Sequence, residues 1–130
     1  MHNPYEKEAK EKWGHTESYA ISQKRVQSYT PEDWEQIHAE AHAIYHRFLE
    51  ISGQDYAQPS VYNLVQDWQN HLSKYYYPCS IEQLEQLGAM YVADQRFVDT
   101  LDQVGMGLAQ VMSDAIEDFC VFQLLKTKNI

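Results

Sequence analysis

Hydrophobic side chains recur at intervals of three and four residues along most of the chain, the spacing of one helical face. The clearest start is Thr30-Pro31-Glu32-Asp33, where threonine can cap a helix, proline suits its first position and an acid its third. The apolar stripe after it consists of Ile37, Ala41, Ile44, Phe48 and Ile51. The pattern predicts a helix that ends before Gly53.

Four further helices follow from the same spacing. The first is ended by Pro78, and its apolar face comprises Val61, Leu64, Val65, Trp68, Leu72 and Tyr75. A second capping-box pattern, Ser80 with Gln83, opens the next helix, whose face comprises Ile81, Leu84, Leu87 and Tyr91. Asp94 caps a short helix with Phe97, Val98 and Leu101. After Gly105 and Gly107, the last helix carries Val111, Met112, Ala115, Ile116, Phe119 and Phe122.

The N-terminal segment is patterned differently. Residues 4–12 and 17–28 are helix candidates, the second capped by Thr16, and both are strongly polar. We therefore expect residues 1–29 to be a polar helical lid and residues 30–130 to be the helical core of the same domain. The prediction is an all-α fold, a single compact helical domain of about five to seven helices, because no β alternation persists.

Composition narrows the class of protein. The 130 residues are 44% hydrophobic, enough to fold without a metal or disulfide framework. Ten basic and nineteen acidic residues give a net charge of -9, which disfavours direct contact with DNA or anionic membranes. The charged N-terminus lacks a secretory pattern, and Cys79 and Cys120 have no CxxC spacing. We expect a cytoplasmic protein with reduced thiols.

Four histidines could suggest a metal or haem. His38, His42 and His46 are spaced for chelation, yet they lie opposite the apolar stripe of their helix, so we expect them to face water. His71 lies beside Leu72 at the flank of the core, a poor position for an axial haem ligand. We predict no metal and no cofactor, and a globin-like haem or metal module remains the alternative.

The sequence offers little for catalysis. Cys79 lies at a helix start, where the helix dipole could lower its thiol pKa, although a structural thiol is the simpler interpretation. Cys120 falls beside the last apolar stripe, and Asp114, Glu117 and Asp118 lie on the outer face of that helix. No GxGxxG, P-loop or HExxH motif occurs. We predict that the protein is not an enzyme.

Tyr75, Tyr76 and Tyr77 are consecutive at a helix end. On a helix they spread over about 200°, so all three cannot enter one core. At least one must face a cleft, a partner or solvent. A tyrosine-lined cleft with a few polar groups suits a polycyclic or heteroaromatic ligand.

Two stretches resemble a known family. YEKEAKEKWGHTESYAISQKRVQSYTPEDW resembles the opening of TipAS-type antibiotic-recognition domains, and LGAMYVADQRFVDTLD followed by GLAQVMSDAI resembles their later helices. The resemblance implies a globin-like arrangement of helices that binds bulky apolar antibiotics, thiopeptides above all. It also implies either the effector half of a MerR-type transcription regulator, whose absent N-terminal half contacts DNA, or a stand-alone drug-binding resistance protein.

The resemblance also carries particular residues. Cys79 matches the first of two family cysteines, and Gln86 stands where the second, which captures dehydroamino acids, is expected; covalent capture is therefore in doubt. Tyr77 matches a family tyrosine, while Pro78 replaces an acidic residue. We expect a cleft between the N-terminal helices and residues 61–92, lined by Trp13, Tyr76, Tyr77, Cys79, Gln86 and Tyr91, with Tyr19 a further anchor from the lid.

Overall fold

Six helices make up the described part of the chain. The computed structural model describes residues 16–128, with side chains to residue 126. Its helices are α2 (Glu17–Gln27), α3 (Pro31–Glu50), α4 (Pro59–Tyr75), α5 (Ile81–Ala93), α6 (Gln95–Asp102) and α7 (Leu108–Lys128). No strand occurs among these residues, and the all-α class is confirmed. The helix predicted at 4–12 lies outside the described residues.

The predicted helix starts are confirmed by their hydrogen bonds. At α3, the backbone N–H of Asp33 donates to Thr30 Oγ1 at 3.1 Å, and the N–H of Thr30 donates to the Asp33 carboxylate at 3.0 Å. The same reciprocal pair joins Ser80 and Gln83 at α5. Each capping box satisfies N–H groups that the first helical turn leaves without a partner.

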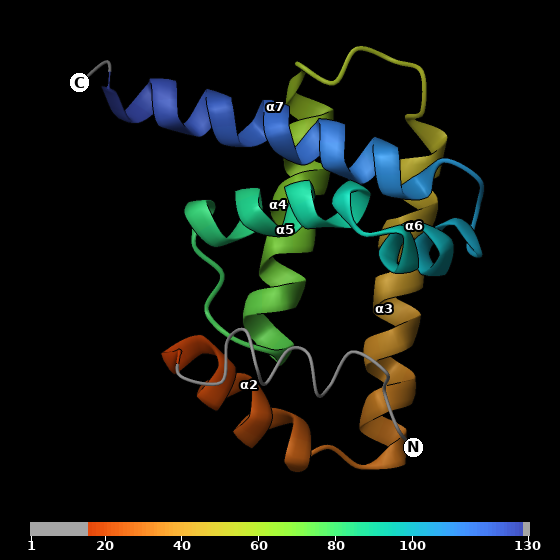
Figure 1. Cartoon of the computed structure of the whole chain (residues 1–130), viewed down its shortest axis with the longest axis vertical. Coiled ribbons are helices and arrows are strands. Elements are labelled where there is room, and N and C mark those ends of the chain that lie inside the picture. The colour runs from red at the N-terminus through yellow and green to blue at the C-terminus, as the bar shows by residue number, and fades with distance from the viewer. Residues whose placement is uncertain (1–15, 129–130) are drawn as a thin grey trace.

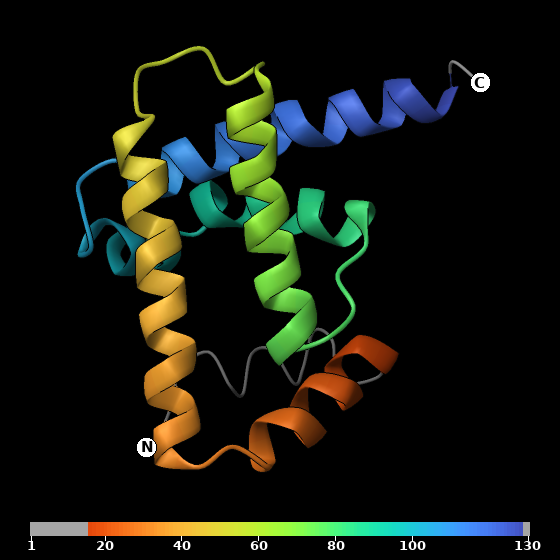
Figure 2. The ribbon, with the colours of Figure 1, turned by 180° about the vertical axis from the view of Figure 1, so that it is seen from behind.

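The helices form two crossed layers (Figures 1 and 2). α3 and α4 run antiparallel in one layer, and α5 and α7 run antiparallel across them, with α6 beside. α2 lies across the ends of α3 and α4 that are remote from their connecting loop. No helix among residues 16–128 is long and apolar enough to cross a membrane.

The core lies between these layers. Its most deeply buried side chains include Phe48, Leu84, Leu108, Met112, Ile116 and Phe119. α5 and α7 approach closely at Gly88, where an added Cβ would lie 2.9 Å from Cγ2 of Ile116. α2, by contrast, contributes no buried residue. The core is therefore built by the helices after residue 30.

The histidines divide between surface and core. His38, His42 and His46 are exposed, as the helical periodicity predicted. The prediction for His71 was wrong: only 6% of it is exposed, and its ring stacks on Trp68 with 5.4 Å between centroids. α4 is contacted by α2, α3 and α7, so a wider arc of it is buried than its apolar stripe indicates.

Candidate functional site

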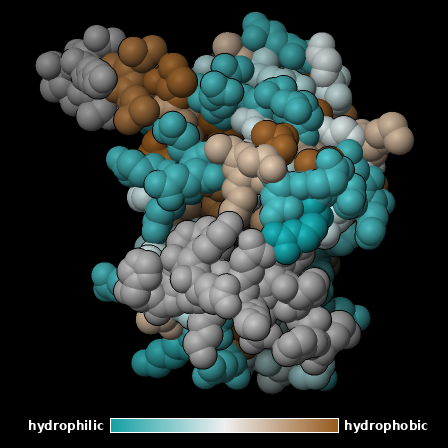
Figure 3. All heavy atoms as spheres, in the orientation of Figure 1, coloured by the Kyte–Doolittle hydropathy of each residue, from teal (hydrophilic) through white to brown (hydrophobic). Residues whose placement is uncertain are grey.

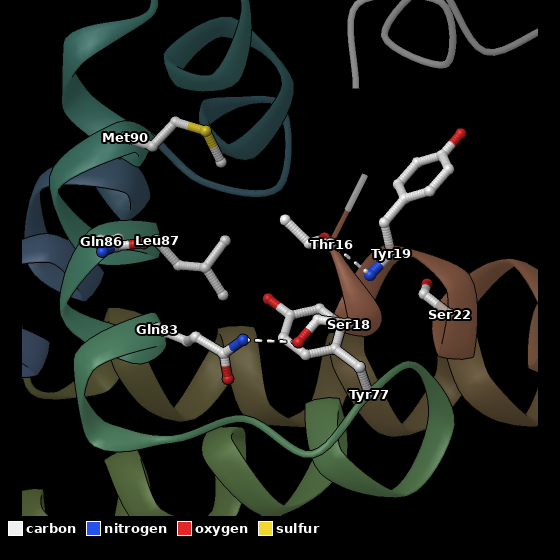
Figure 4. A pocket seen from close by; sticks show the side chains of 9 residues that line it. All are labelled: Thr16, Ser18, Tyr19, Ser22, Tyr77, Gln83, Gln86, Leu87 and Met90. Carbon is white, nitrogen blue, oxygen red and sulfur yellow. Dashed lines mark hydrogen bonds between the residues drawn. The ribbon is translucent and has the colours of Figure 1, made fainter. Parts of the chain in front are cut away.

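A pocket of about 320 Å³ separates α2 from α5, in the region where the sequence predicted a cleft. Figure 4 shows Leu87 and Met90 extending from α5 toward α2, with the ring of Tyr77 between the two helices. The described residues that line it are Thr16, Ser18, Tyr19, Ser22, Tyr77, Gln83, Gln86, Leu87 and Met90. The lining thus combines aromatic, apolar, hydroxyl and carboxamide groups.

Gln83 connects the two walls of the pocket. Its Oε1 accepts a hydrogen bond from the backbone of Ser80 at 3.0 Å and so completes the α5 cap. Its Nε2 donates to Oγ of Ser18 on α2 at 2.6 Å (Figure 4). One carboxamide therefore both orients the start of α5 and holds α2 beside it.

α2 is attached at its other end by bonds to the end of α4. The Arg25 guanidinium donates to the Ser73 carbonyl at 2.7 Å. The Tyr29 hydroxyl donates to the Tyr75 carbonyl at 2.6 Å. These donors satisfy carbonyls in the last turn of α4, which have no partner within the helix. The pocket wall formed by α2 is thus held through polar groups.

The three consecutive tyrosines separate as helical geometry requires. Tyr75 packs against the His71 ring and donates its hydroxyl to Glu40. Tyr76 lies half-buried near Trp34. Tyr77 faces the pocket, and burial together with nearby Cys79 raises the pKa of its phenol to about 12. The phenol of Tyr77 is therefore neutral and available as a hydrogen-bond donor.

Of the residues that the sequence predicted as ligand contacts, the structure brings only Tyr77 and Gln86 to this pocket. Tyr91 lies in the core, where its hydroxyl accepts from Trp68 Nε1 at 3.3 Å and burial raises the pKa of its phenol. Tyr76 and Cys79 also lie away from the lining, and Trp13 lies outside the described residues. Contact of these four with a ligand stays a prediction.

Cys79 does not behave as a thiol activated by a helix start. It is buried, its Sγ donates to the Ser80 carbonyl at 3.7 Å, and burial raises the pKa of the thiol to about 11. Desolvation thus outweighs the helix dipole at this position. Cys120 is buried as predicted, and both thiols are free.

The lining favours recognition over reaction. No lining residue among those described carries a charged side chain, a histidine or a thiol. Across residues 16–128, no group of three or more His, Cys, Asp or Glu side chains could hold a metal ion. Tyrosine rings can stack on a planar ligand, Leu87 and Met90 can exclude water, and the amides can fix its orientation.

The fold and the pocket define an all-helical domain with a cavity suited to a small molecule. The chain belongs to the TipAS antibiotic-recognition domain family, whose profile matches residues 5–119. This membership confirms the family to which the sequence was similar, and the matches give no support to the haem alternative.

Similar proteins are longer than the matched region. The HTH-type transcriptional activator TipA of Streptomyces coelicolor is 36% identical over 114 residues, which are 86% of this chain and 45% of TipA. The HTH-type transcriptional activator mta of Bacillus subtilis is 31% identical over 102 residues, 78% of this chain and 40% of mta. The chain therefore spans less than half the length of these activators.

A solved structure supports the fold. It is the complex of nosiheptide with TipAS, from a thiopeptide antibiotic multidrug resistance system of Streptomyces lividans. It is 35% identical to this chain, with a TM-score of 0.84 over 92% of this chain and 85% of TipAS. A globin-like arrangement of the helices stays a prediction.

Proposed function

We propose that the pocket between α2 and α5 binds a bulky, apolar, thiopeptide-like antibiotic reversibly and without turnover. The observation that carries this proposal is the uncharged, tyrosine-containing lining, in a chain whose solved relative is in complex with nosiheptide. Apolar burial would supply most of the affinity, at about 25 cal/mol per Å² before the cost of ordering.

The size of the pocket indicates how such a ligand enters. Its volume of about 320 Å³ lies at the lower end of the range of about 300–1,000 Å³ typical of ligand sites. A macrocycle therefore requires α2 to move away from α5. Because α2 buries no residue and is held by polar bonds, it is the wall that can move. This supports a lid function for residues 16–29, the described part of the predicted lid.

Gln86 supports non-covalent binding. It lines the pocket. The resemblance to the family places it where a reactive cysteine is expected, and a carboxamide is no nucleophile. The remaining thiol near the site, Cys79, is buried and protonated at neutral pH. A dehydroalanine-containing ligand should therefore leave the protein unmodified.

The longer relatives suggest the biological setting. We propose that this cytoplasmic domain is the effector part of a MerR-type regulator or sequesters the drug by itself. The net charge of -9 supports DNA contact only through another segment or polypeptide. Expression of this chain alone in a susceptible host tests sequestration, which should raise the inhibitory drug concentration.

Titration calorimetry with nosiheptide tests the binding proposal directly. Leu87→Gln should weaken binding by about tenfold or more, because it removes an apolar pocket side chain. Val92→Gln is the matched control, since Val92 lies exposed on the same helix outside the pocket lining. Absence of binding tighter than about 100 µM would contradict the proposal.

Intact-mass spectrometry after incubation with nosiheptide tests the non-covalent part. The native chain should keep its mass, whereas Gln86→Cys should gain one ligand mass. In that variant the thiolate sulfur would add to the β-carbon of a dehydroalanine, and the α-carbon would take a proton, with no leaving group. An adduct on Cys79 of the native chain would contradict non-covalent binding.

A further inference from the structure

The C-terminal part of α7 extends beyond the helical body (Figures 1 and 2). It exposes apolar side chains. The exposed fractions are 49% for Val121, 42% for Phe122, 40% for Leu124 and 55% for Leu125. Figure 3 shows a hydrophobic surface at this end of the molecule. The segment 119–125 carries no charge in a chain that is 22% charged residues. Such a contiguous apolar patch is characteristic of an interaction surface.

A groove of about 580 Å³ lies directly beside this patch, between the start of α4 and α7. Phe119 and Phe122 from α7 and Tyr62 from α4 contribute its aromatic lining. The rings of Tyr62 and Phe122 stack with 4.7 Å between centroids and 25° between planes. Phe122 is therefore held in place although part of it is exposed, so this surface needs little ordering before it binds a partner.

The charges around the patch are arranged symmetrically. Asp118, Phe122 and Lys126 are spaced four residues apart and so form one row along α7. The charged members flank the aromatic ring, and no ion pair among the described residues includes them. If two α7 helices pack antiparallel about an axis through Phe122, Asp118 of each copy lies beside Lys126 of the other.

We propose that this surface binds a second copy of the chain, through antiparallel pairing of the ends of α7. A two-fold interface brings the same patch of both copies together, so the patch must complement itself. The row of acid, aromatic ring and base complements itself. When one copy is reversed, its base lies beside the acid of the other copy and its apolar surface lies against the other copy's groove. Both ion pairs form at once.

The interface is separate from the antibiotic pocket. It lies at the end of α4 and α7 that is remote from α2 (Figure 1), so pairing leaves the pocket open. Its exposed apolar side chains, Val121, Phe122, Leu124 and Leu125, follow residue 119, where the match to the family ends. Pairing is therefore inferred as a property of this chain, on grounds independent of the proposed ligand.

Sedimentation velocity from about 1 to 500 µM tests the pairing. We expect a reversible dimer with a Kd of about 1–100 µM, because the patch is small for a permanent interface. Leu125→Glu should raise the dimer Kd by more than about tenfold. The matched control is Met106→Glu, since Met106 is 94% exposed on the α6–α7 turn. A monomer at every concentration, or a dimer that tolerates Leu125→Glu, would overturn the proposal.

Charge reversal tests the geometry. Asp118→Lys alone and Lys126→Asp alone each create two like-charge contacts and should weaken self-association by about tenfold at low salt. A mixture of the two variants should associate as a heterodimer, because both contacts then join opposite charges. Failure of the mixture to associate more tightly than either variant alone would overturn the antiparallel arrangement.

Discussion

α2 and α5 face each other across one pocket but are attached to the molecule by different interactions. α5 buries Leu84, Gly88 and Tyr91 and packs along α7. α2 buries no residue. It is held by hydrogen bonds that Arg25 and Tyr29 donate and by one that Ser18 accepts. A fully buried large apolar side chain contributes about 1.5–3 kcal/mol, a hydrogen bond about 0.5–1.5 kcal/mol. The pocket therefore has one fixed wall and one weakly held wall.

This difference locates where the molecule opens most easily. Local opening requires the loss of only those interactions that the segment makes with the rest of the molecule. The interactions that hold α2 are polar, and water can partly replace them. The interactions that hold α5 are the apolar contacts of the core. The contrast leads to four predictions, in order of decreasing effect.

Truncation in the core should have the largest effect. Phe48→Ala removes a fully buried ring from α3 and should lower the free energy of unfolding by about 3–5 kcal/mol. Ile21→Ala on α2 is the control and should cost less than about 1 kcal/mol, because α2 buries no residue. Chemical denaturation measures both, and equal losses would remove the distinction between the two regions.

Gly88→Ala should push α5 away from α7. The new methyl group would meet Ile116 at its Cγ2 and Cβ, and the Cβ cannot rotate aside. We expect a loss of about 1–3 kcal/mol in unfolding free energy. Ile116→Ala in the same chain should make room for the new methyl group. The double variant should therefore lose less unfolding free energy than the sum of the two single variants. Strict additivity would show that the helices do not meet at Gly88.

The stability of the core should decrease in mild acid. Burial of the His71 ring lowers its pKa below the usual 6.5, and Lys74 adds to this effect while Glu40 opposes it. The unfolded chain therefore binds a proton more readily, so stability is complete above about pH 6.5 and falls below it. His71→Gln should flatten the dependence of unfolding free energy on pH between 7.5 and 5.5. His46→Gln, at an exposed position, is the matched control.

The smallest effect concerns the bond between the two walls. Ser18→Ala removes the acceptor of the Gln83 amide and should speed hydrogen exchange of amides 17–27 by about 2- to 10-fold. Ser22→Ala is the control, also on α2 and in the pocket lining, and should leave the exchange rate of these amides unchanged. Amides of α4 should exchange slowly in both variants. Nosiheptide should slow exchange in α2, whereas equal, high protection of α2 and α4 in the free protein would argue against a lid.

Most of the fold could be predicted because helix starts are local. The capping boxes at Thr30 and Ser80 involve residues three positions apart, so the sequence alone indicates them. Burial of His71 could not be predicted in this way. It depends on how many helices surround α4, which is a property of tertiary packing.

The pocket was predicted only in part for the same reason. Consecutive tyrosines required one ring outside the core, and Tyr77 is the ring that faces the pocket. Periodicity assigned Leu87 and Tyr91 to one apolar face, but the structure places Leu87 at the pocket and Tyr91 in the core. The lining residues that were missed are Thr16, Ser18, Ser22, Gln83, Leu87 and Met90. Their proximity arises only when the chain folds and places α2 opposite α5.

The stacking of Trp68 on His71 has an optical consequence. The two rings lie 13° from parallel, and the indole N–H donates to Tyr91 within the core. An imidazolium ion accepts an electron from an excited indole, whereas neutral imidazole hardly does so. Protonation of His71 should therefore dim the emission of Trp68. The ring of Trp34, the other tryptophan among the described residues, lies 5.5 Å from that of exposed His38 and is tilted by 32°. Without any added dye, the brightness of the Trp68 emission thus reports the state of the protein's interior.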